Sequence, residues 1–140
     1  MRVLLATSIL IFVSSVQASA LDKAFETINA GNYKEGIILL NPIAKQGNVR
    51  AQYNLGVMYR DGYGTAKNCT KAKEWLLKAA KQGHVDAQYN YGQMHHGGEC
   101  TPYNYKVAKQ WYEIAAKSNS PEAIHNLASI YKNGSGVPKL

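Results

Sequence analysis

Two cysteines and a pair of neighbouring histidines are the side chains of this sequence with the clearest chemistry. Cys69 and Cys100 are the only cysteines, and His95 and His96 lie shortly before the second one. Thiolates and imidazoles are zinc ligands, so one interpretation is a metal site. Adjacent histidines on a helix point about 100° apart, however, and cannot readily bind one ion together. An even number of cysteines favours a disulfide if the protein is exported, and we expect no metal ion and no cofactor.

A second pattern with catalytic potential is Ser129-x-x-Lys132, which has the serine-lysine spacing of penicillin-recognising enzymes. The companion Ser-Asp-Asn and Lys-Thr-Gly elements do not occur in the sequence. In a chain with this many lysines, one such pair arises readily by chance. A weak hydrolase of β-lactam or cell-wall type is therefore the alternative to a protein that is not an enzyme.

The elements that carry these residues repeat with a period of thirty-six residues. AQYNLGVMYRDGYG begins at residue 51 and AQYNYGQMHHGGEC begins at residue 87. Fifteen positions are identical between residues 51–86 and 87–122, and a partial third copy covers residues 123–140. A repeat of this length is typical of helical solenoids, in which each copy buries the apolar face of its neighbour.

Each full copy predicts two helices, here called helix A and helix B, separated by a glycine-bearing loop. Helix A starts near Asn48 in the first copy, and helix B is capped by Asn68 or by Asn104. Helix B ends at Gly83 or at Asn119, because these residue types best accept the left-handed conformation that closes a helix. The buried stripe of helix A follows helical spacing and consists of Ala51, Leu55, Met58 and Tyr59.

The beginning of the chain reads as a leader followed by a shorter helix pair. Residues 1–20 predict a signal peptide, with Arg2 before an apolar run and cleavage after Ala20. Residues 21–50 predict an N-terminal tetratricopeptide-like helix pair, because AKQG recurs at 44–47 and 80–83. No stretch is long enough for a transmembrane span. We therefore expect a periplasmic or secreted protein.

The charge of the chain is basic but dispersed. The formal net charge is +7, and removal of Arg2 with the leader would lower it to +6. The lysines are scattered rather than gathered in one run, as is usual for solvated helix faces. Nucleic acid is therefore not the expected partner.

Three groups of residues in the first full copy form a specific combination: Leu55-Gly56 with Tyr59, Gly62-Tyr63-Gly64, and Lys71-Ala72 with Trp75 and Ala79-Ala80. This combination resembles the Sel-1-like repeat, a relative of the tetratricopeptide repeat, and the start of the mature chain is similar to exported bacterial members. The resemblance implies an all-α fold, a right-handed α-α superhelix of antiparallel helix pairs. It also implies an adaptor or scaffold, with helix A residues lining a concave surface that holds other proteins.

The expected binding face consists of helix A positions that packing does not use. Asn54, Asn90 and Asn126 form a ladder that could bond to a peptide backbone, or else to the loop of the adjacent repeat. A second equivalent position carries a basic row, which consists of Arg60, His96 and Lys132. This row favours an acidic or C-terminal carboxylate ligand. The complete predicted peptide-binding set is Tyr53, Asn54, Val57, Arg60, Tyr89, Asn90, Gln93, His96, His125, Asn126 and Lys132.

Both cysteines fall in, or at the edge of, the loop between helix A and helix B. Adjacent repeats stack these loops side by side, so Cys69 and Cys100 could meet although thirty-one residues separate them. Such a bridge would contribute about 3 to 4 kcal/mol in the chain-entropy model. In the cysteine-rich branch of the family that the chain resembles, bridges usually join the two helices within one repeat, so this pairing departs from that pattern.

The last copy has only helix A, which closes the stack alone. Its apolar residues are expected to cover the preceding repeat on one side: Ile124, Leu127, Ile130 and Tyr131. The other side lacks a cap, which leaves three interpretations open: a partner, a homodimer or a truncated product.

Overall fold

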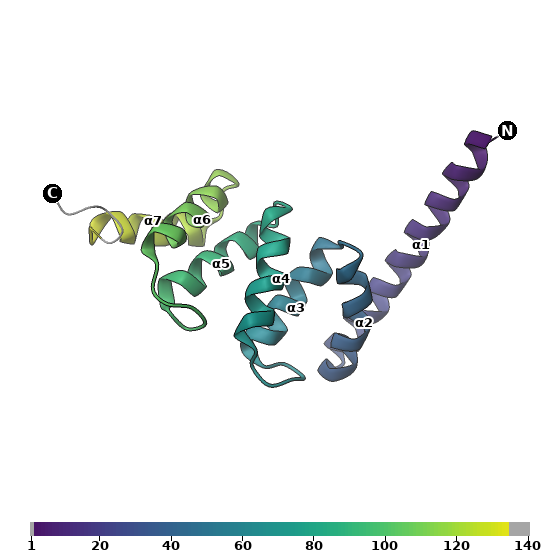
Figure 1. Cartoon of the computed structure of the whole chain (residues 1–140), viewed down its shortest axis with the longest axis horizontal. Helices are drawn as coiled ribbons and strands as arrows, with labels where there is room; N and C mark the ends of the chain where they lie inside the picture. Colours follow the sequence, from purple (N-terminus) through teal and green to yellow (C-terminus); the bar gives the residue numbers. More distant parts are fainter. Residues whose placement is uncertain (1, 135–140) are drawn as a thin grey trace.

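The protein is an elongated row of α-helices, seen here in a computed structural model that describes residues 2–134. Within that range the model has no β-strand. Strong contacts join consecutive helices, so the chain zigzags from one end of the row to the other (Figure 1). The helices are α1 (Arg2–Asn29), α2 (Tyr33–Lys45), α3 (Val49–Asp61), α4 (Cys69–Lys81), α5 (Val85–Gly97), α6 (Tyr105–Lys117) and α7 (Pro121–Lys132).

Helices A and B of the repeats are therefore α3 with α4 and α5 with α6, and α7 is a further helix A whose helix B is not among the described residues. The predicted helix B caps are confirmed, because Asn68 and Asn104 each accept a hydrogen bond from the backbone N–H three residues later. Asn119 is the one non-glycine residue with positive φ among the described residues, at 61°, where the sequence predicts a helix-closing position.

The first helix continues through the predicted leader. α1 runs from Arg2 past Ala20 to Asn29, and its last part packs on α2 through the buried residues Leu21 and Ala24. Cleavage after Ala20 stays a prediction. In the part of the chain that the structure describes, none of the helices is both long and apolar enough to cross a membrane.

Small residues allow the paired helices to approach closely. A Cβ atom added to Gly56 of α3 would lie 2.6 Å from Cγ of Leu76 on α4. One added to Gly92 of α5 would lie 2.9 Å from the ring of Tyr112 on α6. Each helix A therefore meets its helix B at a glycine, and alanines such as Ala72 and Ala79 fill the adjoining core.

Buried glutamines join α3 and α5 to the preceding helix B. Gln52 donates to the carbonyl of Ala44 and Gln88 donates to that of Ala80, both at 3.1 Å. Gln82 also donates to the Oε1 atom of Gln52, at 2.6 Å. The next repeat has Ser118 in place of Gln82, and the buried Oε1 atom of Gln88 has no hydrogen-bond partner among the described residues.

The last helix packs differently from the sequence prediction. Ile130 is buried and Leu127 lies against the same cluster, as expected. Ile124 instead exposes 48% of its surface at the position of Gln52 and Gln88, so the prediction that it covers the preceding repeat is wrong. Tyr131 exposes 51% of its surface, but it does contact α6, because its hydroxyl donates to Glu113 at 3.0 Å and its ring centroid lies 4.7 Å from Nζ of Lys109.

Candidate functional site

Successive A helices are linked by a repeated tyrosine-asparagine contact. Asn90 of α5 donates to the hydroxyl of Tyr53 on α3, and Asn126 of α7 donates to that of Tyr89 on α5. Both distances are 3.3 Å, and each pair is thirty-seven residues apart. The same contact therefore fixes the alignment of neighbouring A helices along the face predicted to bind a peptide.

The three asparagines of the predicted ladder donate hydrogen bonds within the chain. Asn90 is buried, and its Oδ1 atom accepts a hydrogen bond from Arg60 at 3.0 Å. Asn126 also donates to the hydroxyl of Tyr112 at 3.4 Å. Asn54 is half-exposed, donates to the carbonyl of Arg50, and has no recorded partner for its Oδ1 atom in the described chain. Asn90 and Asn126 therefore contact side chains of neighbouring helices rather than the loop of the adjacent repeat, which was the alternative to a peptide.

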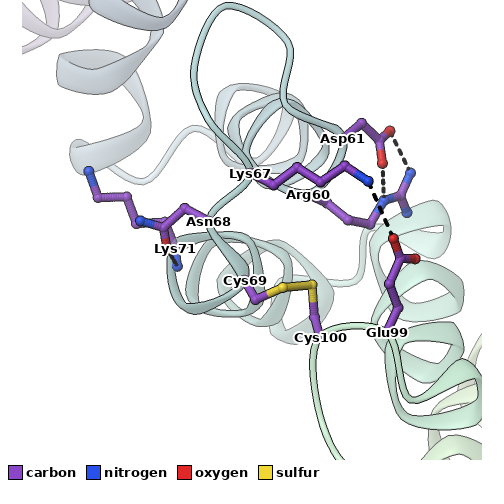
Figure 2. The surroundings of a disulfide bond; sticks show 8 residues. All are labelled: Arg60, Asp61, Lys67, Asn68, Cys69, Lys71, Glu99 and Cys100. Atoms are coloured by element: carbon purple, nitrogen blue, oxygen red, sulfur yellow. Dashed lines mark hydrogen bonds and ion pairs between the residues drawn. A yellow bond between two sulfur atoms is a disulfide. The ribbon is translucent and has the colours of Figure 1, made fainter.

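The predicted basic row begins with a neutralised arginine. Arg60 donates to both carboxylate oxygens of Asp61, at 2.7 and 2.9 Å (Figure 2). These hydrogen bonds raise the pKa of the Arg60 guanidinium and lower the pKa of the Asp61 carboxyl. His96 at the equivalent position faces the Tyr112 hydroxyl, 3.3 Å from its Nδ1 atom, and Lys132 is exposed. The three side chains therefore do not form one open row of cations.

Tyr112 is a buried polar centre that the sequence analysis did not identify. Its side chain is fully buried on α6, and its hydroxyl meets His96 and Asn126 from the two flanking A helices. Burial raises the pKa of Tyr112 to about 12. The sequence does carry a signal for it, because Tyr112 stands where the preceding repeat has the apolar Leu76.

His84 is a second residue that the sequence analysis missed. It is the N-cap of α5, and its Nδ1 atom accepts a hydrogen bond from the Ala87 N–H at 3.3 Å. Its ring stacks on Tyr53, with 4.4 Å between the ring centroids. Burial lowers the pKa of His84, with Asp86 opposing and Arg50 adding to this effect. The equivalent caps, Asn48 and Ser120, do not titrate.

The predicted disulfide between Cys69 and Cys100 is present, with 5.0 Å between the Cα atoms (Figure 2). Cys69 is the first residue of α4, and Cys100 lies in the loop after α5. Beside the bridge, Lys67 and Glu99 are an exposed ion pair at 3.6 Å. The covalent bond therefore ties the A–B loop of one repeat to the helix B of the repeat before it.

The two neighbouring histidines have separate surroundings. His95 contacts the Tyr91 ring edge-on, and both of its ring nitrogens are buried without a hydrogen-bond partner among the described residues. His96 instead meets the rings of Tyr105 and Tyr112. Across the described residues, no three histidine, cysteine or acidic side chains come together as a set of metal ligands.

The serine of the possible hydrolase motif has an ordinary helical environment. Ser129 is half-exposed on α7, and its Oγ atom accepts a hydrogen bond from Asn133 at 3.5 Å. No contact between Ser129 and Lys132 is recorded in the described chain. The geometry therefore offers no activated nucleophile at this position.

Shallow hollows follow the helix A face. One, of about 570 Å³, lies between α1 and α3, and a second, of about 260 Å³, adjoins it through the shared residue Asn54. A third, of about 320 Å³, lies between α3 and α5, with Arg60, Gln93 and Glu99 among its lining residues. The predicted residues Asn54, Val57, Arg60 and Gln93 thus line these hollows, whereas His125 and Lys132 lie on the exposed surface of α7.

The match to family models decides which family this is. The model of the Sel1 repeat matches residues 49–84, 85–120 and 121–139, which together make up more than half of the chain. The chain belongs to the Sel1 repeat family. The matched repeats begin two residues earlier than the copies defined from the sequence, at the first residues of α3, α5 and α7.

Solved structures of other Sel1 repeat proteins have the same fold. A Sel1 repeat protein from Oxalobacter formigenes is 32% identical, with a TM-score of 0.77 over 84% of this chain and 49% of that one. The protective antigen c5321 of uropathogenic Escherichia coli, which displays an SLR fold, is 26% identical, with a TM-score of 0.84 over 89% of this chain and 27% of that one. The predicted all-α, right-handed solenoid is thereby confirmed.

This Sel1 repeat chain spans about half the length of the first relative and about a quarter of the second. No curated protein is significantly similar to it. Sel1 repeat proteins are generally protein-interaction modules, and their fold is typically a scaffold rather than an enzyme.

Proposed function

We propose that this Sel1 repeat protein is a non-catalytic interaction module that binds an extended segment of another protein along its concave helix A face. The observation that best supports this is the series of hollows along α1, α3 and α5, because their lining residues include side chains of the predicted binding face. Stacked repeats offer such elongated surfaces for partners, and each added repeat extends the surface.

The residues of this face have two roles in the proposal. Direct contact with the partner falls to half-exposed and exposed side chains of α3, α5 and α7: Tyr53, Asn54, Val57, Tyr89, Gln93, His125 and Lys132. Arg60, Asn90 and Asn126 join neighbouring A helices, and His96 contacts Tyr112 on the adjoining helix B. Arg60 is already paired with Asp61. This part of the face therefore does not favour the acidic or C-terminal carboxylate ligand that the sequence predicts.

Photo-cross-linking tests the choice of face. A photoreactive phenylalanine at Val57 or at Gln93 is expected to capture partner proteins in an extract of the producing cells. The matched control places the same group at Lys73, an exposed residue of helix B on α4. Equal capture from Lys73 and from the two helix A positions would count against the helix A face.

We also propose that the protein acts in the cell envelope or outside the cell. The Cys69–Cys100 disulfide supports this location, because disulfides persist in oxidising compartments. Intact-mass measurement of the protein isolated from the producing cells is expected to show a chain that begins at Leu21. A chain that keeps residues 1–20 would contradict the leader prediction.

The C-terminal end carries the apolar residues Ile114, Ile124 and Tyr131 at its surface. A homodimer through this end stays a prediction from the sequence. Sedimentation velocity of the wild type and of Ile124→Gln tests it, since a dimer held by this surface would dissociate in the variant.

A further inference from the structure

The first two hollows of the helix A face differ in chemistry although they share Asn54. The larger hollow, between α1 and α3, is lined by Asp22, Phe25, Glu26, Asn29, Arg50 and Asn54. The smaller one is lined mostly by apolar and aromatic side chains: Ile28, Tyr33, Asn54, Val57, Met58 and Tyr63. The two hollows meet at Asn54 and are here together called the N-terminal groove, with an acidic half and an apolar half.

The acidic half has two carboxylates that form no ion pair. Asp22 and Glu26 are exposed, one turn apart on α1, and neither takes part in an ion pair among the described residues. In the part of the chain that the structure describes, Arg50 is the one cation that lines this half, and its guanidinium lies 4.7 Å from the centroid of the Phe25 ring. The arginine is thus held on an aromatic face, and two carboxylates remain available to a positive ligand group.

The apolar half has two tyrosine rings that are exposed to solvent. Tyr33 and Tyr63 expose 39% and 47% of their surfaces, and their ring centroids are 5.3 Å apart. They come from the start of α2 and from the loop after α3, so the pair closes one side of the groove. Removing such surface from water would favour binding of an aliphatic or aromatic side chain.

We infer that the N-terminal groove binds an extended protein segment that carries an apolar side chain close to a lysine or arginine. The apolar side chain lies against Tyr33, Val57 and Tyr63, and the basic side chain lies between Asp22 and Glu26. Asn54 stands between the two halves, and its free Oδ1 atom can accept a hydrogen bond from a backbone N–H of the segment. This inference rests on the proposed function and adds the chemistry of the partner.

Labelled peptides test the charge preference. The probes are fluorescein-labelled glycine-serine peptides that carry one leucine and one lysine, with the spacing varied, and matched peptides with glutamate in place of lysine. In low-salt buffer, fluorescence anisotropy is expected to show about tenfold tighter binding of the best leucine-lysine peptide. Equal or tighter binding of its glutamate counterpart would overturn the inference.

Substitutions test whether the preference for lysine over glutamate comes from the N-terminal groove. Asp22→Asn/Glu26→Gln is expected to remove the difference between the two peptides, and Tyr63→Ser is expected to weaken both alike. Glu74→Gln/Glu122→Gln makes the same change of charge on α4 and α7 and should keep the difference. A preference that survives Asp22→Asn/Glu26→Gln would overturn the inference. All substituted side chains are exposed, and unchanged thermal unfolding would verify that the fold is intact.

The outcomes separate this inference from the proposed function. Partner capture at Val57 without any charge preference would leave the proposed function standing and remove the inference. Absence of both capture at the helix A positions and peptide binding would remove both. Self-association of the wild type that Asp22→Asn/Glu26→Gln abolishes would mean that the groove holds a second copy, which would also overturn the inference.

Discussion

The residues of the helix A face show how one repeat position can carry different chemistry in successive copies. Asn48, His84 and Ser120 occupy the same cap position, and each accepts a hydrogen bond from the N–H three residues later. Only the histidine can change its charge near neutral pH. Its Nδ1 atom must be unprotonated to accept from Ala87, so the cap of α5 requires the neutral ring.

We expect the stability of the protein to fall in mild acid partly through His84. Because folding lowers the pKa of His84, the unfolded chain binds the proton more readily. Stability is therefore full above the unfolded value of about 6.5, decreases as the pH falls through it, and reaches its lower level below the folded pKa. His84→Asn keeps a cap and removes this titration.

The measurement is the free energy of unfolding in urea at neutral and at mildly acidic pH. His84→Asn should lose less stability between the two conditions than the wild type. His125→Asn is the matched control, because His125 is exposed on α7, and it should behave like the wild type. An identical loss in His84→Asn and in the wild type would show that the cap does not respond to pH.

At the residue scale, the sequence could show which positions are equivalent but not which partners they take. Asn54, Asn90 and Asn126 fall in one register, yet the contact that uses two of them spans thirty-seven residues rather than thirty-six. That extra step depends on how neighbouring A helices are rotated, which the repeat period does not specify. The partners of Tyr112 could not be predicted from the repeat period either, because this buried hydroxyl lies where the preceding repeat has the apolar Leu76.

At the scale of elements, the disulfide replaces a contact that the first repeat makes without a covalent bond. One period before Cys69 and Cys100 lie Tyr33 and Gly64. A Cβ atom added to Gly64 would lie 2.5 Å from the backbone of Tyr33 and Lys34, so the loop already touches the start of α2 closely. Both pairs are separated by thirty-one residues, and both tie an A–B loop to the preceding helix B.

We expect Cys69→Ala/Cys100→Ala to lower the free energy of unfolding by about 3 to 4 kcal/mol, because the unfolded chain loses its cross-link. Cys69→Tyr/Cys100→Gly rebuilds the residue types of the first repeat and should recover part of this loss. Urea unfolding, with and without reductant, measures both. A reductant effect in either double variant, or an alanine variant as stable as the oxidised wild type, would contradict this account.

The close approach of helix A to helix B gives a second prediction at this scale. Gly56→Ala should lower the free energy of unfolding by about 1 to 3 kcal/mol, because the new methyl group would overlap Leu76. Gly97→Ala is the matched control on α5, where an added Cβ atom meets nothing within 4 Å. Alanine is also the better helix former, so this control should be neutral or slightly stabilising. Equal destabilisation by the two changes would show that the close packing at Gly56 is not the cause.

The order and bounds of the helices were the part of the fold that the sequence predicted best. Caps such as Asn68 and Asn104, together with the closing residue Asn119, recur at fixed positions, so local chemistry and the repeat period agree. The prediction failed for Ile124 of α7, which is exposed. The spacing of apolar residues alone does not determine which side of α7 faces the preceding repeat.

At the scale of the whole molecule, the stack offers a long face whose chemistry changes along its length. The end formed by α1, α2 and α3 has the acidic and apolar halves of the N-terminal groove. The middle has Arg60 and Asp61 paired with each other, beside the loop that the disulfide fixes. A partner that follows this face would therefore meet its charge-selective contacts at the N-terminal end.

The most direct test of the binding face is an NMR titration of the isotope-labelled protein with the leucine-lysine peptide. We expect shifts of backbone amides in residues 22–29 and 50–57, with Ile114 and its neighbours on α6 unchanged. Shifts confined to the outer surfaces of α2, α4 and α6 would contradict this expectation, because the bound segment would then lie on the B helices.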